Sequence, residues 1–299
     1  MNTYSQGKLQ AYKDKNENRA RLLIKCPDQP GIVAAVSKFL YDHEANIVAS
    51  NQYTMDPEGG EFFMRVEFDC PDLKENAERI ELEFLPLASG FQMEWKMMYV
   101  SELKNMAIFV SKEPHCLLEL LWEWQSGDLM ANIALVISNH ETAREMVESL
   151  GIPFYYIPAS KEIRKQVEEQ QKQLLEQYDV DIIVLARYMQ ILTNDFVKGY
   201  ENRIINIHHS FLPAFIGAKP YERAYQRGVK MIGATSHYVT SDLDEGPIIE
   251  QNIGRVDHRD NEEAMKKIGQ SIERSVLARA VKWHLDDRII VHRNKTIVF

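Results

Sequence analysis

The chain has 299 residues, 45% hydrophobic and 26% charged, which is the composition of a globular protein long enough for two domains. Its net charge of −9 disfavours a nucleic-acid partner, since nucleic-acid binders present a basic face, and no apolar run approaches the ~20 residues that cross a bilayer. The odd, widely spaced set of Cys26, Cys70 and Cys116 is typical of a reducing compartment, so we expect a cytoplasmic protein without a membrane partner.

The first hundred residues predict a small domain with the element order βαββαβ. Residues 1–20 are polar, contain no apolar block and are expected to form a frayed tail. The domain spans 21–101, and its elements are a strand at 21–26, a helix from Ile32 to about His43, a strand from Asn46, a hairpin turn at 57–60, a returning strand at 62–68, a helix at 72–88 and a strand at 91–99. This order is typical of a ferredoxin-like domain, in which the helices cover one side of an antiparallel sheet.

Residues 102–299 predict a second domain in which strands alternate with helices. Strands are expected at 106–111, 131–137, 154–157, 182–186 and 204–208, with helices from about 114, after 140, at 161–177 and at 193–200. Such alternation indicates an α/β domain with an open, mostly parallel, Rossmann-like sheet. A β-ribbon at 231–240 and 247–256, a long helix capped by Asp260 and two short strands are expected to complete the domain. The charges of 161–172 are predicted to lie on a solvated helix face.

Asn206, His208 and Asp244 are the candidate catalytic residues. Side chains alternate along a strand, so Asn206 and His208 share a face, and both lie where the strand at 204–208 ends. Open α/β sheets bind ligands beyond the carboxyl ends of their strands. An amide and an imidazolium there could hold a developing oxyanion, or a neutral His208 could relay a proton. Asp244 could hold a water, orient His208 or accept a proton, and together these groups suit attack on a carbonyl.

A purely structural role for the same residues is also consistent with the sequence. An Asn-x-His pair at a strand end can cap backbone groups, and an Asp-rich loop such as 241–247 is often only a turn. Two separate loops of the same domain nevertheless bring short polar groups to apolar strands, which favours catalysis.

Four ordered motifs resemble the formyltetrahydrofolate-dependent formyltransferase family. They are 187–192 (RYMQIL), 206–213 (NIHHSFLP), 233–237 (GATSH) and 242–247 (DLDEGP). The resemblance covers residues 105–299 and implies that Asn206, His208 and Asp244 are the catalytic residues. It also implies a folate pocket formed by Met189, Gln190, Ile191, Leu192, His237, Asp242 and Leu243. Folate would be a substrate, 10-formyltetrahydrofolate, so no cofactor is expected, and no cluster of His, Cys and Asp has metal-ligand spacing.

The loop after the first strand of the second domain indicates which nucleophile is used. Members of the family that formylate glycinamide ribonucleotide carry glycines there, which cradle the substrate phosphate. This chain instead has Ser111-Lys112-Glu113-Pro114-His115-Cys116. Pro114 offers no backbone N–H, and Glu113 would repel a phosphate. Water is then the expected nucleophile. His209 stands where the transferases usually have proline, and a structural histidine is as consistent with the sequence as a catalytic helper.

The first domain resembles an ACT domain, a regulatory module that often binds amino acids. The resemblance rests on 26–32 (CPDQPGI), 45–47 (ANI) and the βαββαβ order. It implies an amino-acid effector such as methionine or glycine and a homo-oligomer, and the backbone N–H groups at the first helix start suit a carboxylate. The implied effector residues are Asp28, Gln29, Pro30, Gly31 and Asn46. An alternative is that Pro30-Gly31 only starts the helix and that the domain serves assembly.

The two resemblances together imply a hydrolase that splits 10-formyltetrahydrofolate into formate and tetrahydrofolate, supplies formate for purine synthesis and balances one-carbon pools. One alternative is a formyltransferase with an amine acceptor, of the glycinamide ribonucleotide type. Another is a non-catalytic amino-acid sensor, against which the intact set of Asn206, His208 and Asp244 argues.

Overall fold

The computed structural model describes residues 3–56, 59–160, 162–213 and 220–299, which form two compact units. One unit consists of Gly7–Leu103 with Asp286–His292 and Ile297–Phe299. The other consists mainly of Lys104–Leu285 with Arg293–Thr296. No helix in the described ranges combines the length and the apolar character that a bilayer span requires.

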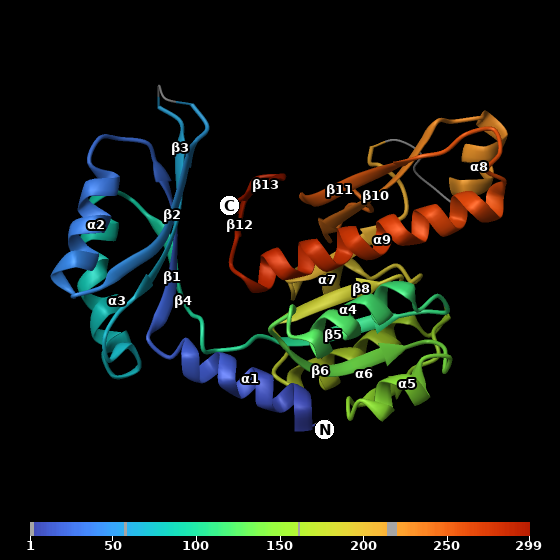
Figure 1. The fold of residues 1–299 in the computed structure, drawn as a ribbon, viewed down its shortest axis with the longest axis horizontal. Helices are drawn as coiled ribbons and strands as arrows, with labels where there is room; N and C mark the ends of the chain where they lie inside the picture. Colours follow the sequence, from blue (N-terminus) through green and yellow to red (C-terminus); the bar gives the residue numbers. More distant parts are fainter. Residues whose placement is uncertain (1–2, 57–58, 161, 214–219) are drawn as a thin grey trace. The chain divides into compact units, whose positions relative to one another are not determined.

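The first unit has the predicted ferredoxin-like architecture. Its elements are α1 (Thr3–Lys15, which begins before the unit), β1 (Arg19–Pro27), α2 (Ile32–Asp42), β2 (Asn46–Thr54), β3 (Glu61–Asp69), α3 (Leu73–Gly90) and β4 (Glu94–Tyr99). The strands form one antiparallel sheet in the order β2-β3-β1-β4. Figure 1 shows α2 and α3 together on one face of this sheet. Apolar residues at helical spacing on α2 and α3 pack there against every second residue of β1 and β3.

The opposite face of β3 is also buried, which strand alternation did not predict. Phe63 and Arg65 are 0% and 6% exposed. The ring of His292 lies against Phe63 with centroids 5.4 Å apart, and Nε of Arg65 donates to the carbonyl of Asp287 at 2.9 Å. The end of the chain therefore covers this face. The predicted assignment of all of 102–299 to the second domain is wrong for these C-terminal residues.

The predicted polar tail at 1–20 is wrong over most of its length, because α1 is a helix and β1 begins at Arg19. The C-terminal end of α1 is held by Asn16, whose side-chain amide donates to the carbonyl of Tyr12 at 2.7 Å. Asn16 is 6% exposed, so its amide satisfies one of the carbonyl groups that the end of a helix leaves unpaired. Residues 57 and 58 of the predicted hairpin turn lie outside the described residues.

The second unit has the predicted alternation of strands and helices. Its elements are β5 (Asn105–Val110), α4 (His115–Ser126), β6 (Asn132–Ser138), α5 (Arg144–Ser149), β7 (Phe154–Tyr156), α6 (Arg164–Gln177), β8 (Ile182–Ala186), α7 (Asn194–Lys198), β9 (Ile204–His208), α8 (Pro220–Arg227), β10 (Met231–Tyr238), β11 (Ile248–Arg255) and α9 (Glu262–Leu285). The short strands β12 (Ile289–His292) and β13 (Lys295–Val298) pair with each other.

The seven strands of the large sheet have the order β11-β10-β9-β8-β5-β6-β7. β5 to β9 are parallel, and β10 and β11 form the predicted ribbon, antiparallel to β9 and to each other. α6 and α7 pack on one face through apolar side chains such as Leu175 and Phe196, and α9 packs on β9, β10 and β11 (Figure 1). Because β5 pairs with both β6 and β8, the chain reverses its direction of winding there. Ligands bind at the carboxyl ends beside such a switch point.

Two local predictions for this unit are wrong. The side chain of Asn261, not of Asp260, caps α9, because Oδ1 of Asn261 accepts from the backbone N–H of Ala264 at 2.9 Å. Asp260 instead accepts from the N–H of Asp257 at 2.7 Å. The helix α8 was not predicted, since it is short and has no capping sequence before it.

Candidate active site

The predicted trio of Asn206, His208 and Asp244 forms one cluster at the carboxyl end of β9. β10 pairs His237 with Asn206, which puts both side chains on one face, and Nδ2 of Asn206 lies 3.2 Å from Nε2 of His237. Asp244 reaches the cluster from the loop between β10 and β11. Its Oδ1 lies 3.2 Å from Nδ1 of His208 and 3.7 Å from Nε2 of His237. His237, predicted to contact folate, is thus a member of the cluster itself.

The hydrogen-bond partners fix which imidazole nitrogens carry hydrogen. Nδ1 of His237 lies 2.9 Å from the carbonyl oxygen of Tyr238, and because a carbonyl only accepts, Nδ1 carries the hydrogen. Nε2 of His237 then accepts from one N–H of the Asn206 amide. Nδ1 of His208 donates to the carboxylate of Asp244. Nε2 of His208 is buried without a hydrogen-bond partner among the described residues.

Asp244 is the anionic member of the cluster, with its side chain only 14% exposed. Burial by itself would raise the pKa of Asp244, but the hydrogen bond from the imidazole of His208 outweighs it and holds the pKa well below the ordinary value of a carboxyl group. At neutral pH the group is therefore a carboxylate beside an imidazole. The carboxylate accepts from Nδ1 of His208 and orients its ring, as the buried carboxylate of a catalytic triad does for its histidine.

The Met189–Leu192 loop follows β8 and lies at the same edge of the sheet as His208, because β8 and β9 are parallel neighbours. Met189 and Ile191 are 59% and 55% exposed. Leu243, in the second predicted folate loop, is 63% exposed. Apolar side chains presented from two loops beside a polar cluster are typical of a ligand site.

Three buried polar side chains that were not predicted as functional hold the first of these loops. Ser111, at the end of β5, accepts from the backbone N–H of Met189 at 3.0 Å and donates to Asn139 at 2.7 Å. Glu168 of α6 accepts from the backbone N–H of Thr193 at 2.7 Å and from its hydroxyl. Gln171, one turn later, donates to the hydroxyl of Tyr188 at 2.9 Å.

The prediction that the charges of 161–172 all lie on a solvated face is therefore wrong for Glu168, which is 6% exposed. The spacing of Glu168 in the sequence could have indicated its burial. It lies at helical intervals from Gln171 and Leu175, which are also buried. Ser111 could have been found by the strand-end rule that identified His208.

A second cluster, of charged side chains, lies beside His209. The ring of His209 stacks on His208 with centroids 5.1 Å apart and is 6.5 Å from that of Tyr221. The Tyr221 hydroxyl donates to Glu273 of α9, which is 1% exposed. Burial and the positive charge of Arg187 lower the pKa of His209 to about 4, so this ring is neutral at physiological pH. A proton-carrying role for His209 is thereby disfavoured.

Within the described ranges, His115, Cys116 and Glu273 have possible metal-ligand atoms within 4.8 Å of one another. Their surroundings do not suit a cation. Burial keeps the pKa of the Cys116 thiol far above its ordinary value, so the thiolate that a metal requires is disfavoured. Glu273 already accepts from His115 at 2.8 Å, and the Arg187 guanidinium lies 3.4 Å away.

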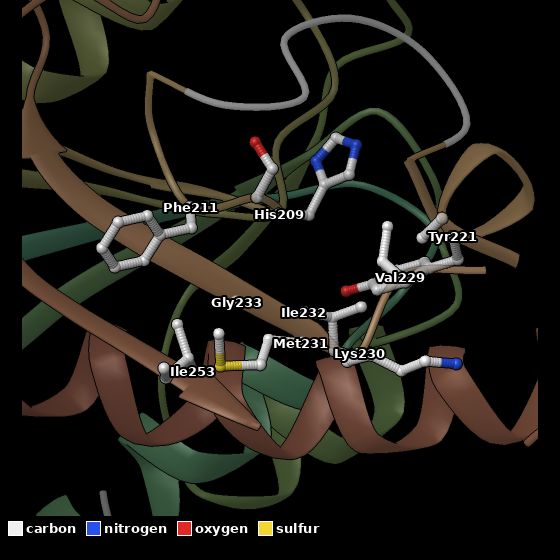
Figure 2. Close-up of a pocket in the computed structure, with 11 residues that line it drawn as sticks. His209, Phe211, Tyr221, Val229, Lys230, Met231, Ile232, Gly233 and Ile253 are labelled. Carbon is white, nitrogen blue, oxygen red and sulfur yellow. The ribbon is translucent and has the colours of Figure 1, made fainter. Parts of the chain in front are cut away.

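A cavity of about 530 Å³ is lined in part by His209 and Tyr221. Figure 2 shows Met231, Ile232 and Ile253 along one side of it and His209 and Phe211 along another. Mostly apolar side chains of β10, β11 and α8 line it, and none of the seven predicted folate-binding residues does. The predicted substrate loops and this cavity are therefore separate features.

Comparison with known proteins identifies the family. The formyl transferase model matches residues 104–281, and the ACT domain model matches residues 20–81. A formyltetrahydrofolate deformylase of Bacillus subtilis is 68% identical over the full length of both chains. The chain belongs to the formyltetrahydrofolate deformylase family. The structure of a formyltetrahydrofolate deformylase from Pseudomonas syringae has a TM-score of 0.89 at 46% identity and covers 94% of each chain.

The catalytic domain of this chain is also similar in fold to solved structures of formyltransferases. The phosphoribosylglycinamide formyltransferase of Coxiella burnetii has a TM-score of 0.60 at 30% identity and covers 66% of this chain and 94% of its own. The likeness is thus confined to about two thirds of the present chain. The match of the ACT model to residues 20–81 confirms the predicted fold of the first domain.

The predicted effector residues of this deformylase-family chain do not form one site within its first unit. Asp28–Gly31 follow the end of β1, where Pro27 pairs with Glu61. Asn46 begins β2 and pairs with Asp69, at the other end of β3. β1 and β2 both run antiparallel to β3, so the start of β2 aligns with the start of β1, about 25 Å from its end. The two parts of the predicted site are therefore separated by the length of the sheet.

Proposed function

We propose that this chain hydrolyses 10-formyltetrahydrofolate to formate and tetrahydrofolate. The observation that carries the proposal is the cluster of Asn206, His208 and Asp244, in which the buried Nε2 of His208 has no hydrogen-bond partner among the described residues. Membership of the deformylase family supports the substrate. The folate would lie along the Met189–Leu192 loop and Leu243, and no cofactor would take part.

In this mechanism Asp244 holds a water molecule beside the formyl carbon while its other contact orients His208. Attack by the water forms a C–O bond and turns the formyl oxygen into an oxyanion. The second N–H of Asn206 and Nε2–H of a protonated His208 stabilise that oxyanion, an effect for which each donor is typically worth about 10²–10³ in rate. The water's proton passes to the Asp244–His208 pair, the C–N10 bond breaks, and N10 leaves with a proton from His208.

The direct test is formate release by the purified protein from 10-formyltetrahydrofolate, with no amine present. Release at a rate far above the spontaneous one is expected. A formyltransferase would show negligible hydrolysis until an amine acceptor is added, so lack of release would refute the hydrolase function. Replacement of Asp244 by Asn should lower kcat by about 10²–10⁴-fold, because the variant keeps the shape and loses the charge that stabilises protonated His208.

The ACT domain is proposed to bind an amino-acid effector, with methionine and glycine as the candidates to test. An amino acid is far too small to contact both Asp28–Gly31 and Asn46 of one chain, which lie at opposite ends of the sheet. A site that uses both would lie between two copies, so the proposal includes a homo-oligomer. Measuring formate release with and without each amino acid tests whether that amino acid is an effector. Light scattering under the same conditions measures the oligomeric state.

The proposed cellular role is that the formate supplies purine synthesis and that its release balances one-carbon pools in the cytoplasm. This role follows from the reaction, because formate is the one-carbon product. Loss of the gene should make growth without added purine depend on another source of formate. Unchanged growth under those conditions would argue against the role and leave the reaction itself untouched.

A further inference from the structure

The loop between β5 and α4 places a carboxylate against two cations. Oε1 of Glu113 accepts from Nζ of Lys266 at 2.5 Å, and Oε2 lies 3.8 Å from Nη2 of Arg187. Gln270 donates a weaker bond to the same carboxylate at 3.4 Å. Burial by itself would raise the pKa of Glu113, but Lys266 and Arg187 outweigh it and lower the pKa, so the group is anionic at neutral pH.

Arg187 is held at the switch point of the sheet, where ligands of this architecture bind. It follows β8, whose neighbour β5 leads into the Glu113 loop. Its side chain is 11% exposed, and its Nε lies 3.4 Å from Glu273, so the guanidinium lies between two carboxylates. Nε and Nη1 are buried and make no hydrogen bond within the described residues. Arg187 therefore has N–H groups that make no hydrogen bond within the described residues, and the carboxylates of Glu113 and Glu273 neutralise its charge.

This charged cluster adjoins the proposed catalytic cluster. The ring of His209 stacks on His208 and faces Tyr221, which donates to Glu273. The charge of Arg187 is close enough to lower the pKa of His209. The contacts of His209 therefore link the catalytic cluster to the cluster that contains Arg187 and Glu273.

We propose that Glu113 is a specificity residue that occupies the cationic position of Lys266 and Arg187 and so excludes acceptors that carry a phosphate. The proposal rests on the proposed hydrolase function, because exclusion of phosphorylated amines leaves water as the nucleophile. A phosphate at this position would have to approach Glu113 within a few ångströms. At a separation of about 6 Å and an effective dielectric constant of about 20, the repulsion of two unit charges weakens binding by about 10²-fold.

The test is a calorimetric titration of inorganic phosphate into the wild-type protein and into the Glu113→Gln variant, which measures the affinity of each for phosphate. The variant keeps the shape of the side chain and removes the charge. It should bind phosphate about 10²-fold more tightly than the wild type. Addition of Lys266→Met to Glu113→Gln should abolish the gain, since the cation that holds the phosphate is then lost. Thermal unfolding of each variant establishes that it is folded.

Glu263→Gln is the matched control. Glu263 lies on α9 one turn before Lys267, with which it pairs at 2.9 Å, and its side chain is 74% exposed. The Glu263→Gln variant changes the net charge by the same amount as Glu113→Gln does. Its affinity for phosphate should equal that of the wild type. Equal phosphate affinity of Glu113→Gln and wild type would overturn the proposal, and so would an equal gain in Glu263→Gln.

Calorimetry needs no turnover, so the two proposals can fail separately. Formate release is measured in parallel on wild type and on Glu113→Gln without an acceptor, and both should hydrolyse. Absence of hydrolysis in the wild type refutes the hydrolase function, whatever the phosphate result. Hydrolysis in both proteins without a gain in phosphate binding refutes only the role of Glu113.

Discussion

Gly246 offers the sharpest test of how closely Asp244 must be placed. A Cβ atom added at Gly246 would lie 1.8 Å from the carbonyl oxygen of Tyr238, whereas ordinary contacts begin at 3.4 Å. Gly246→Ala therefore requires a shift of about 1.6 Å between the Asp244 loop and β10. The clashing atom belongs to the backbone, which cannot change rotamer as a side chain can. The N–H of Tyr238 also donates to the carbonyl of Pro247 at 2.9 Å, so moving the loop away from β10 would strain this hydrogen bond.

A shift of this size acts on the contact between Asp244 and His208. Their atoms are 3.2 Å apart, which is already near the upper limit of a hydrogen bond. Misplacement of a catalytic group by about 1 Å costs roughly 10²-fold in rate. We therefore expect kcat for formate release to fall by about 10²–10³-fold in Gly246→Ala, and KM to rise as well, since Leu243 lies in the displaced loop.

The assay is formate release from 10-formyltetrahydrofolate, with Gly199→Ala as control. A Cβ at Gly199, which follows α7, would have its nearest neighbour at 3.5 Å, an ordinary contact. That variant should keep the wild-type kcat. Thermal unfolding of both variants separates loss of activity from loss of the folded state. Wild-type kcat in Gly246→Ala would refute the reasoning, because the Asp244 loop would then tolerate the displacement.

Three further predictions concern residues around the cluster. The pKa of His209 falls from 6.5 in the unfolded chain to about 4, so the unfolded state takes up the proton first and stability falls as pH drops through that window, by at most about 3 kcal/mol. His209→Gln should remove this loss between pH 6.5 and 4 in urea unfolding, and an unchanged slope would contradict it. Ser111→Ala removes the acceptor for the Met189 N–H and should raise KM by about tenfold with little change in kcat. A wild-type KM would show that the loop needs no such anchor. Thr193→Val should act in the same direction, because it removes the hydroxyl that donates to Glu168, and a fall in kcat alone would argue for another role.

The fold was predictable because its signals are local. The switch from period-two strands in the first hundred residues to alternating strands and helices beyond them identified both units, and the β9 pattern placed Asn206 and His208 on one face. The helix α1 was missed because its sequence is polar and has no apolar periodicity. The cover on β3 was missed because it comes from residues more than 200 positions later in the chain.

The pairing of Asn206 with His237 depends on strand register, which no local pattern specifies. β10 carries a register shift between Ser236 and His237 where it pairs with β11. Side chains alternate between faces, so a slip of one residue would turn His237 away from Asn206. The sequence could therefore nominate His237 for the site through its family motif, while its contacts with Asn206 and Asp244 required the structure.

The charged cluster around Glu113 shows why the exclusion of a phosphate-bearing acceptor could be predicted only in part from the sequence. The sequence indicates that Glu113 would repel a phosphate, but Lys266, Arg187 and Glu273 come from elements far apart in the chain. Once assembled, two carboxylates face two cations, so the cluster is balanced without any ligand. An incoming anion would have to break an existing ion pair, whereas neutral water meets no such cost. The balance of charges in this cluster therefore supports the proposal that Glu113 excludes phosphorylated acceptors and leaves water as the nucleophile.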